Sequence, residues 1–284
     1  MKTPQKHNIK TSPVRSPRGG IFLRPIPPAW WVFILASGLS LYDLFWAFIP
    51  LIFFVILCFV AVFFPGWQFF FHTVMHGSRS RNRVSLTFDD GPDQETTPAL
   101  LALLDKHNVK AAFFIVGNKA ARYPELISEI LSRGHELGNH SLNHDVFLML
   151  RTSATLRHEI EGCSQALEAS GIRALAFRPP VGIVSPRLKP VLERLGMFCV
   201  GFSVRGGDWG NRKISGLSER ILSRVRPGDI VLLHDCRPAG REISEWRGEV
   251  EAVITGLKRK KIEPAKLSEL LGREIMIIPR RQGK

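Results

Sequence analysis

The chain has 284 residues, 45% of them hydrophobic, which is enough for one large domain or two small ones with a sizeable core. Its formal net charge of +14 could indicate nucleic-acid binding. Nine of the basic residues flank one apolar segment, however, where anionic lipid headgroups are the nearer partner, and the sequence contains no zinc-finger, RNP-type or helix-turn-helix signature. Charge placement therefore argues against a nucleic-acid partner.

Residues 29–64 form an almost unbroken apolar run in which Asp43 is the only ionisable group apart from Tyr42 and Cys58. A bilayer core of about 30 Å needs about 20 apolar residues per helix, so the run exceeds one span and is short of two full ones. A cleaved signal peptide would be shorter and nearer to Met1. We therefore predict a transmembrane anchor over residues 29–72, preceded by a basic cytoplasmic tail at 1–28.

The flanks of this anchor leave two topologies open. Basic, acid-free segments occur on both sides, which suits a hairpin in the inner (plasma) membrane with residues 30–42 entering and 44–64 returning. The rest of the chain would then be cytoplasmic. A single pass over 44–64 would instead place it on the external, periplasmic side; the hairpin is the favoured interpretation. Four aromatic residues after the run are typical of an interfacial belt: Trp67, Phe69, Phe70 and Phe71.

From Arg83 onward, strand-like and helix-like segments alternate. The pattern predicts strands at 84–88, 111–116, 135–137, 174–177, 198–202 and 230–233. It predicts helices at 97–107, 124–133, 153–170 and 217–225, and another that has Ser185 as its cap and Pro186 as its first residue. Strands that alternate with helices pair in parallel with the helices outside, so the expected architecture is an α/β barrel.

Chemically active residues gather where these predicted strands end. Each of the following comes just after a strand: Asp89, Asp90, His140, His144, Arg178, Asp208, Trp209 and His234. The loops at the C-terminal end of a barrel's strands converge to build its active site. One Asp and two neutral imidazoles can hold a divalent metal with open positions for water, which leaves the second Asp free to act as a base. This inventory indicates a metal hydrolase.

Five ordered segments strengthen that interpretation. They are Thr87-Phe88-Asp89-Asp90-Gly91-Pro92, His140-Ser141-Leu142-Asn143-His144, Arg178-Pro179-Pro180-Val181-Gly182, Asp208-Trp209 and Leu232-Leu233-His234-Asp235. In this order they resemble the five motifs of the polysaccharide deacetylase family, also called the NodB-homology domain or carbohydrate esterase family four. The resemblance covers residues 79–272 as a catalytic domain, followed by a basic tail at 273–284. It implies a distorted (β/α) barrel of fewer than eight strands.

The resemblance also implies a metal site and a base. Asp90, His140 and His144 would be the ligands, a set that suits Zn²⁺ and also Co²⁺ or Ni²⁺. Asp89 would take a proton from metal-bound water, and Arg178 would position this base. The alternative interpretations are a pair of loop histidines for His140 and His144, and a turn residue before Gly91-Pro92 for Asp89.

The remaining roles follow from the same resemblance. His234 would be the general acid that protonates the departing amine, with Asp208 holding its ring in the right tautomer. The backbone N–H of Val181 would meet the oxyanion, although the family usually has Tyr at that position. Leu232 and Trp209 would wall a small pocket for the acyl methyl. The fourth motif often begins with an Asp where this chain has Arg205.

These observations predict a membrane-anchored, metal-dependent hydrolase that removes an N-acetyl or similar N-acyl group from a sugar. The expected partners are the membrane and an N-acetylated sugar, either polymeric or lipid-linked; no feature indicates an oligomeric state. The alternative function is a membrane-tethered glycan-binding pseudoenzyme of the same fold. Retention of Asp89, Asp90, His140, His144 and His234 argues against it, because a binding module needs no base and acid together.

Overall fold

The computed structural model describes residues 28–279. The chain divides into two compact units, one ending at Leu57 and the other beginning at Cys58. The predictions for the basic tail at 1–28 and for the last residues of the tail at 273–284 lie outside the described residues, apart from their inner ends.

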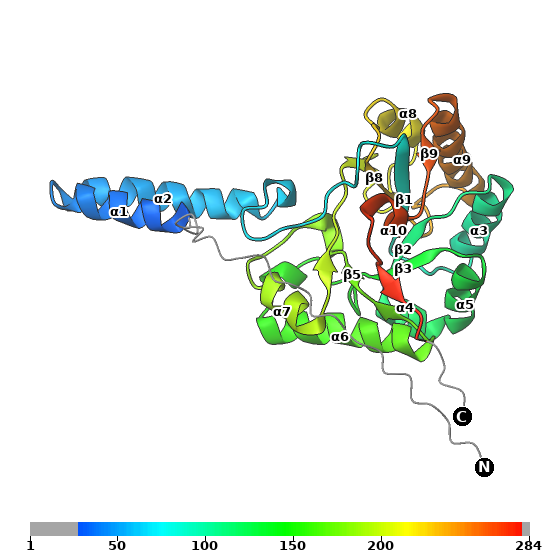
Figure 1. Ribbon diagram of the computed structural model, residues 1–284, viewed down its shortest axis with the longest axis horizontal. Helices are drawn as coiled ribbons and strands as arrows, with labels where there is room; N and C mark the ends of the chain where they lie inside the picture. The colour runs from blue at the N-terminus through cyan, green and yellow to red at the C-terminus, as the bar shows by residue number, and fades with distance from the viewer. Residues whose placement is uncertain (1–27, 280–284) are drawn as a thin grey trace, which may run out of the picture. The chain divides into compact units, whose positions relative to one another are not determined.

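The first unit contains two apolar helices joined by a turn. Helix α1 (Pro28–Ser40) and helix α2 (Leu44–Ala61) lie side by side (Figure 1). Asp43 Oδ1 accepts the backbone N–H of Phe45 at 2.8 Å and so caps the start of α2. The chain therefore turns between two apolar helices near Asp43. Among the described residues α2 is the one helix long and apolar enough to cross a membrane; α1, at 13 residues, is about 20 Å long.

The second unit is built on a curled sheet whose seven ordered strands are all parallel to their neighbours. Their order is β6 (Phe198–Cys199), β5 (Ala176–Phe177), β3 (Glu136–Asn139), β2 (Ala112–Ile115), β1 (Arg83–Asp89), β8 (Ile230–His234) and β7 (Val204–Arg205). Strand β9 (Glu263–Pro264) pairs beside them with the start of β1. A separate antiparallel pair joins β4 (Arg173–Ala174) and β10 (Met276–Ile277).

The predicted distorted barrel is confirmed in part: the described sheet is curled, but it stays open between β6 and β7. Both strands have only two residues, and each pairs on one side alone, β6 with β5 and β7 with β8. The chain before β1 partly bridges the opening, since Val74 pairs with Val200 and His76 pairs with Asp229. The architecture is therefore a half-barrel, consistent with the distorted barrel that the resemblance implies.

Helices cover the sheet from outside (Figure 1). They are α3 (Thr96–Lys106), α4 (Gly117–Arg122), α5 (Pro124–Ser132), α6 (Ser153–Ala169), α7 (Leu188–Leu195), α8 (Leu217–Leu222), α9 (Ile243–Arg259) and α10 (Leu267–Leu271). Helix α6 buries Leu156, Ile160, Cys163 and Leu167, the residues whose spacing predicts it. Most predicted boundaries agree within three residues.

Three local predictions are wrong. Helix α7 begins at Leu188 rather than at Pro186, and Ser185 contributes its carbonyl oxygen to the Leu188 N–H instead of a side-chain cap. The strand at 174–177 is divided because Leu175 and Ala176 both donate to the carbonyl of Ile275. The strand at 198–202 ends at Cys199, after which Gly201 pairs with Val74.

The predicted aromatic belt is also only partly exposed. Trp67 is 56% exposed, whereas Phe70 and Phe71 pack against the hydrophobic core of the second unit.

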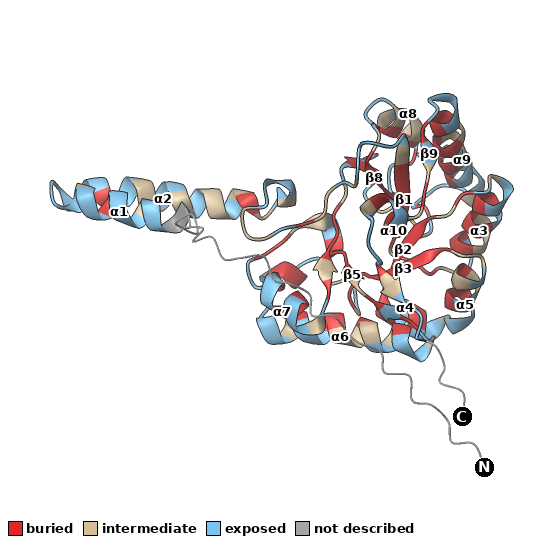
Figure 2. Ribbon diagram, in the orientation of Figure 1, coloured by how far each residue is buried: buried red, intermediate tan, exposed pale blue. Residues whose placement is uncertain are grey.

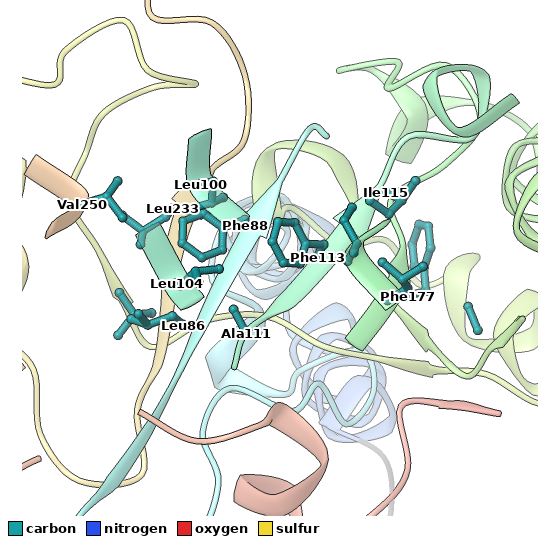
Figure 3. Close-up of a cluster of buried hydrophobic side chains, with 14 of the residues drawn as sticks. Leu86, Phe88, Leu100, Leu104, Ala111, Phe113, Ile115, Phe177, Leu233 and Val250 are labelled. Carbon is teal, nitrogen blue, oxygen red and sulfur yellow. The ribbon is translucent and has the colours of Figure 1, made fainter. Parts of the chain in front are cut away.

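The core of the second unit fixes the positions of the strand ends. Phe88 of β1 and Phe113 of β2 stack with ring centroids 5.5 Å apart, and both are fully buried. Figure 3 shows Phe88 between Phe113 and Leu233, with Leu86 further along the same strand. The strands are buried while the helices expose their outer faces (Figure 2). A sheet buried on both faces holds its C-terminal edge rigidly.

The stacked pair gives a stability prediction. Phe113→Ala removes a fully buried ring and leaves a cavity, so the free energy of unfolding should fall by about 3–5 kcal/mol. Thermal or denaturant unfolding of the full chain in detergent measures this change. Phe147→Ala, at a ring that is 58% exposed, is the matched control and should change stability by less than about 1 kcal/mol. Equal losses in the two variants would contradict this account of the core.

Candidate active site

The parallel register of the sheet aligns the C-terminal ends of β2, β1 and β8 beside one another. Asp89, the last residue of β1, pairs with Phe114 of β2 and with His234, the last residue of β8. His140 comes directly after β3, and Arg178 comes directly after β5. Neighbouring parallel strands therefore place residues that are far apart in sequence along one edge.

Asp90, His140 and His144 converge on one point. Asp90 Oδ1 lies 3.4 Å from His140 Nε2 and 3.0 Å from His144 Nε2, and the three ligand atoms lie within 4.8 Å of one another. Although both rings face this buried oxygen, neither meets it with hydrogen-bond geometry, and no other donor among the described residues does so. His140 Nδ1 donates to the carbonyl of Arg178 at 2.8 Å, which leaves Nε2 as the lone-pair atom facing Asp90. One carboxylate and two imidazoles in this arrangement fit a divalent metal.

Four residues around this point have a left-handed backbone, which side-chain-bearing residues rarely adopt. The φ angles are +72° at Asp90, +57° at His144, +54° at Val181 and +54° at Trp209. Such conformations cost free energy and persist where the surrounding structure imposes them, often at functional sites. The surrounding structure therefore holds these four residues in a strained backbone conformation at the site.

Asp89 lies against a buried cation. Arg178 is fully buried, and its Nη1 donates to Asp89 Oδ1 at 2.7 Å and to Thr87 Oγ1 at 2.8 Å. Its Nη2 donates to the carbonyl of Gly201 at 2.8 Å, and the guanidinium lies over the ring of Phe114 at 3.9 Å. Burial lowers the pKa of Arg178 and Asp89 opposes this change, but an arginine remains protonated at any physiological pH. Asp89 is therefore fixed in orientation by a permanent positive charge.

His234 and Asp208 form a second pair. His234 Nδ1 lies 2.7 Å from Asp208 Oδ2, so Nδ1 carries the proton of this hydrogen bond and Nε2 is directed away from Asp208. Burial disfavours the imidazolium, but the hydrogen bond and charge of Asp208, with the charges of Asp90 and Asp89, raise the pKa of His234 to about 9. The ring is therefore protonated at neutral pH.

The charge on Asp90 has a similar local origin. Burial raises the pKa of Asp90, but the two imidazoles outweigh this effect and hold the pKa well below its usual range. Burial lowers the pKa of His144, and Asp90 more than compensates, so the pKa of His144 is raised. The carboxylate is thus ionised and ready to bind a cation.

These groups line one cavity of about 650 Å³. Nine of the ten predicted site residues are on its wall: Asp89, Asp90, His140, His144, Val181, Asp208, Trp209, Leu232 and His234. The tenth, Arg178, is fully buried behind Asp89, to which it donates a hydrogen bond. Leu232 is nearly buried, while Trp209 is 71% exposed and Val181 belongs to a short 3₁₀ turn at Pro180–Gly182. The volume is that of an ordinary small-molecule site.

Comparison with known proteins gives the family. The family model of polysaccharide deacetylases matches residues 76–200. A chitooligosaccharide deacetylase from a Bradyrhizobium species is 37% identical over 170 residues, which cover 59% of this chain and 76% of the relative. The chain belongs to the polysaccharide deacetylase family. The motifs at Asp208-Trp209 and at Leu232 to Asp235 lie beyond the part that the family model matches.

Other relatives agree. The peptidoglycan-N-acetylglucosamine deacetylase PgdA of Listeria monocytogenes is 30% identical over 200 residues, which cover 70% of this chain but only 41% of that longer protein. The crystal structure of the Bc1960 peptidoglycan N-acetylglucosamine deacetylase superimposes with a TM-score of 0.65 at 30% identity, covering 72% of this chain and 94% of that one. The half-barrel is therefore the fold of this deacetylase family.

Several residues around the cavity were not among those that the motifs predict as functional. Thr87, inside the first motif, accepts from Arg178, and its own hydroxyl donates to the carbonyl of Val231. Asn211 bonds the carbonyls of His234 and Cys236 and so fixes the end of β8. Five basic side chains also line the cavity: Arg205, Arg212, Lys213, Arg220 and Arg224. A dispersed set of this kind has no sequence signal, because only folding brings its members to one wall.

The last residue of the fifth motif has a structural place. Asp235 accepts the hydroxyls of Thr96 and Thr97, at 2.7 and 2.6 Å, and so ties the start of α3 to the end of β8. Burial raises the pKa of Asp235 to about 6, against the opposing effect of these two hydrogen bonds.

The His234–Asp208 pair gives a pH prediction. Because the pKa of His234 is raised in the folded state, the pair contributes stability that is full below about pH 6.5 and is lost as the pH rises through about 9. Asp208→Asn should therefore lower the melting temperature more at pH 6 than at pH 9.5, as thermal unfolding of the full chain can measure. Glu219→Gln, at an exposed carboxylate, is the control and should show no such pH dependence. An Asp208→Asn effect of the same size at both pH values would contradict the raised pKa.

Proposed function

We propose that this chain is a metal-dependent hydrolase that removes an N-acetyl or similar N-acyl group from a sugar in a glycan or lipid-linked saccharide. The observation that carries the proposal is that a carboxylate with two imidazoles, a second carboxylate and a protonated histidine all open into one cavity. The relatives named above are deacetylases of peptidoglycan N-acetylglucosamine or of chitooligosaccharides, which supports the sugar amide as substrate.

Asp90, His140 and His144 are the proposed metal ligands, with Zn²⁺ as the first choice and Co²⁺ or Ni²⁺ as alternatives. The bound ion would polarise the acyl carbonyl and lower the pKa of water. The orphaned Asp90 Oδ1 and the unprotonated Nε2 of His140 supply lone pairs that point toward a common site. Both features fit a cation better than they fit a hydrogen-bonded loop cluster.

The proposed proton transfers use the two fixed pairs. Asp89, oriented by Arg178, accepts a proton from the attacking water as the new C–O bond forms. His234, oriented by Asp208, donates its Nε2 proton to the sugar nitrogen as the C–N bond breaks. Acetate and a free amine are the products. The N–H of Val181 would stabilise the oxyanion, and Leu232 and Trp209 would enclose the acyl methyl.

The apolar helices suggest the location of this reaction. In the proposed organisation residues 29–72 anchor the chain in the inner membrane and residues 79–272 form the catalytic domain. The basic flanks favour a hairpin, which would place the active site in the cytoplasm and make a lipid-linked sugar at the inner leaflet the preferred substrate. Tethering would raise the effective concentration of such a substrate. In the alternative topology α2 alone crosses the membrane, and the short α1 lies in the membrane interface. The active site would then be in the periplasm.

Loss of the base should abolish turnover. The purified full chain, loaded with zinc, should release acetate from an N-acetylated sugar conjugate and stop when a chelator removes the metal. Asp89→Asn should lower kcat by about 10²–10⁴-fold, because no carboxylate then takes the proton from water. Metal analysis should find the same zinc content as in the native chain, since Asp89 is not a proposed ligand.

His144→Ala and Glu95→Gln complete this experiment. His144→Ala should lose both zinc and activity, whereas Glu95→Gln, at an exposed carboxylate, should retain both. An Asp89→Asn chain with full zinc and an undiminished rate would refute the assignment. A native chain that binds zinc and glycan but releases no acetate would be the glycan-binding pseudoenzyme.

Reporter fusions test the topology. A fluorescent protein that folds only in the cytoplasm should fluoresce when fused after Lys284, and alkaline phosphatase at the same position should be inactive. Fusion after Asp43, within the turn, should give the reverse pattern, because the hairpin places this turn at the far face. Phosphatase activity at the C-terminus would rule out the cytoplasmic site and favour the single pass.

A further inference from the structure

One wall of the cavity is basic and has no acidic partners. Arg205, Arg212, Lys213 and Arg224 line the cavity with exposed side chains. None of them forms an ion pair with a described carboxylate, while several arginines elsewhere on the surface do. We call these four residues the basic wall.

The acids of the cavity do not neutralise this wall. Asp89 is paired with Arg178 and Asp208 with His234, while Asp90 faces His140 and His144, with which it would share a metal. The positive charge of the basic wall therefore remains available to a ligand. A cleft lined by charge of one sign attracts ligands of the opposite sign more strongly than a flat surface does.

The loop between β7 and α8, which carries Arg212 and Lys213, is held in place. Arg220, also on the cavity wall, donates to the carbonyls of Gly206, Lys213 and Ser215 and thus fixes the chain between β7 and α8. Asn211, within this loop, is fully buried and bonds the carbonyl of His234. The basic wall consequently belongs to the same rigid end of the sheet as the proposed acid.

We propose that the basic wall is a subsite for a phosphate group carried by the acetylated sugar, so that the substrate is a phosphorylated or lipid-phosphate-linked saccharide rather than a neutral glycan. This inference rests on the deacetylase function proposed above. Arginine presents its N–H groups in a planar fork that matches phosphate oxygens, and three of the four cations are arginines. Four cations exceed the need of a single carboxylate, whereas a phosphodiester or pyrophosphate offers several charged oxygens. A cavity of about 650 Å³ has room for a sugar and such a group together.

Paired substrates test the subsite. The zinc-loaded full chain in detergent is given the methyl glycoside of N-acetylglucosamine and, separately, N-acetylglucosamine 1-phosphate, and acetate release is measured for each. The phosphorylated sugar should have a kcat/KM about tenfold higher, the order expected for two exposed charge pairs, and the advantage should shrink as salt is raised from 50 to 500 mM. The double variant Arg212→Gln/Arg224→Gln should bring the ratio of the two kcat/KM values close to one.

Arg194→Gln is the matched control. Arg194 is an exposed arginine of α7 outside the cavity, so its removal should leave the tenfold ratio intact. Titration calorimetry with N-acetylglucosamine 1-phosphate gives a readout independent of turnover: the double variant should bind it about tenfold more weakly, and Arg194→Gln as tightly as the native chain.

The source of the phosphate is distinguished by a vesicle assay. If the double variant loses binding to phosphatidylglycerol vesicles and the substrate ratio is unchanged, the wall binds membrane headgroups and the proposal is overturned. Equal kcat/KM values for the two sugars in the native chain would also overturn it and leave the deacetylase function standing. Absence of acetate from both sugars, with tight binding of the phosphorylated one, would instead count against the deacetylase function and support the phosphate subsite.

Discussion

The buried guanidinium of Arg178 is the interaction on which the arrangement of the site depends. Its N–H groups reach Asp89 and Thr87 on β1 and the carbonyls of Val200 and Gly201 after β6, while its own carbonyl holds the ring of His140. One residue therefore orients both the proposed base and a proposed ligand. A buried cation is stable only when its donors are satisfied, and four hydrogen bonds and the face of Phe114 meet that condition here.

This interaction explains how an open sheet can hold the active-site residues rigidly. A closed barrel would fix the strand ends through a continuous ladder, but β6 and β7 remain unpaired with each other among the described strands. Arg178 links β1 to the chain after β6 through side-chain bonds, and the Val74–Val200 bridge adds a backbone contact on the same side. The site can thus be rigid without complete closure.

The charged residues of the cavity fall into two groups, the carboxylates with their partners and the unpaired basic wall. Each carboxylate in the cavity has a nearby cation or imidazole, which keeps Asp90 ionised and His234 protonated at neutral pH. The basic wall has no such compensation among the described residues. Paired charges suit groups that must hold a fixed protonation state, whereas unpaired cations in a cleft suit recognition of an anion.

Features that depend on local order could be predicted from the amino-acid sequence. The apolar run at 29–64, the strand that ends in Asp89-Asp90 and the helix with Leu156, Ile160, Cys163 and Leu167 on one face could all be predicted, because composition and periodicity encode them directly. The five motifs identified the family and the residues of the candidate site. Folding was needed to reveal the open edge between β6 and β7 and the packing of Phe70 and Phe71 against the core. It also assembled the basic wall from Arg224, after α8, and the chain from Arg205 to Lys213. These features depend on contacts between distant segments, and such contacts have no period or spacing along the chain.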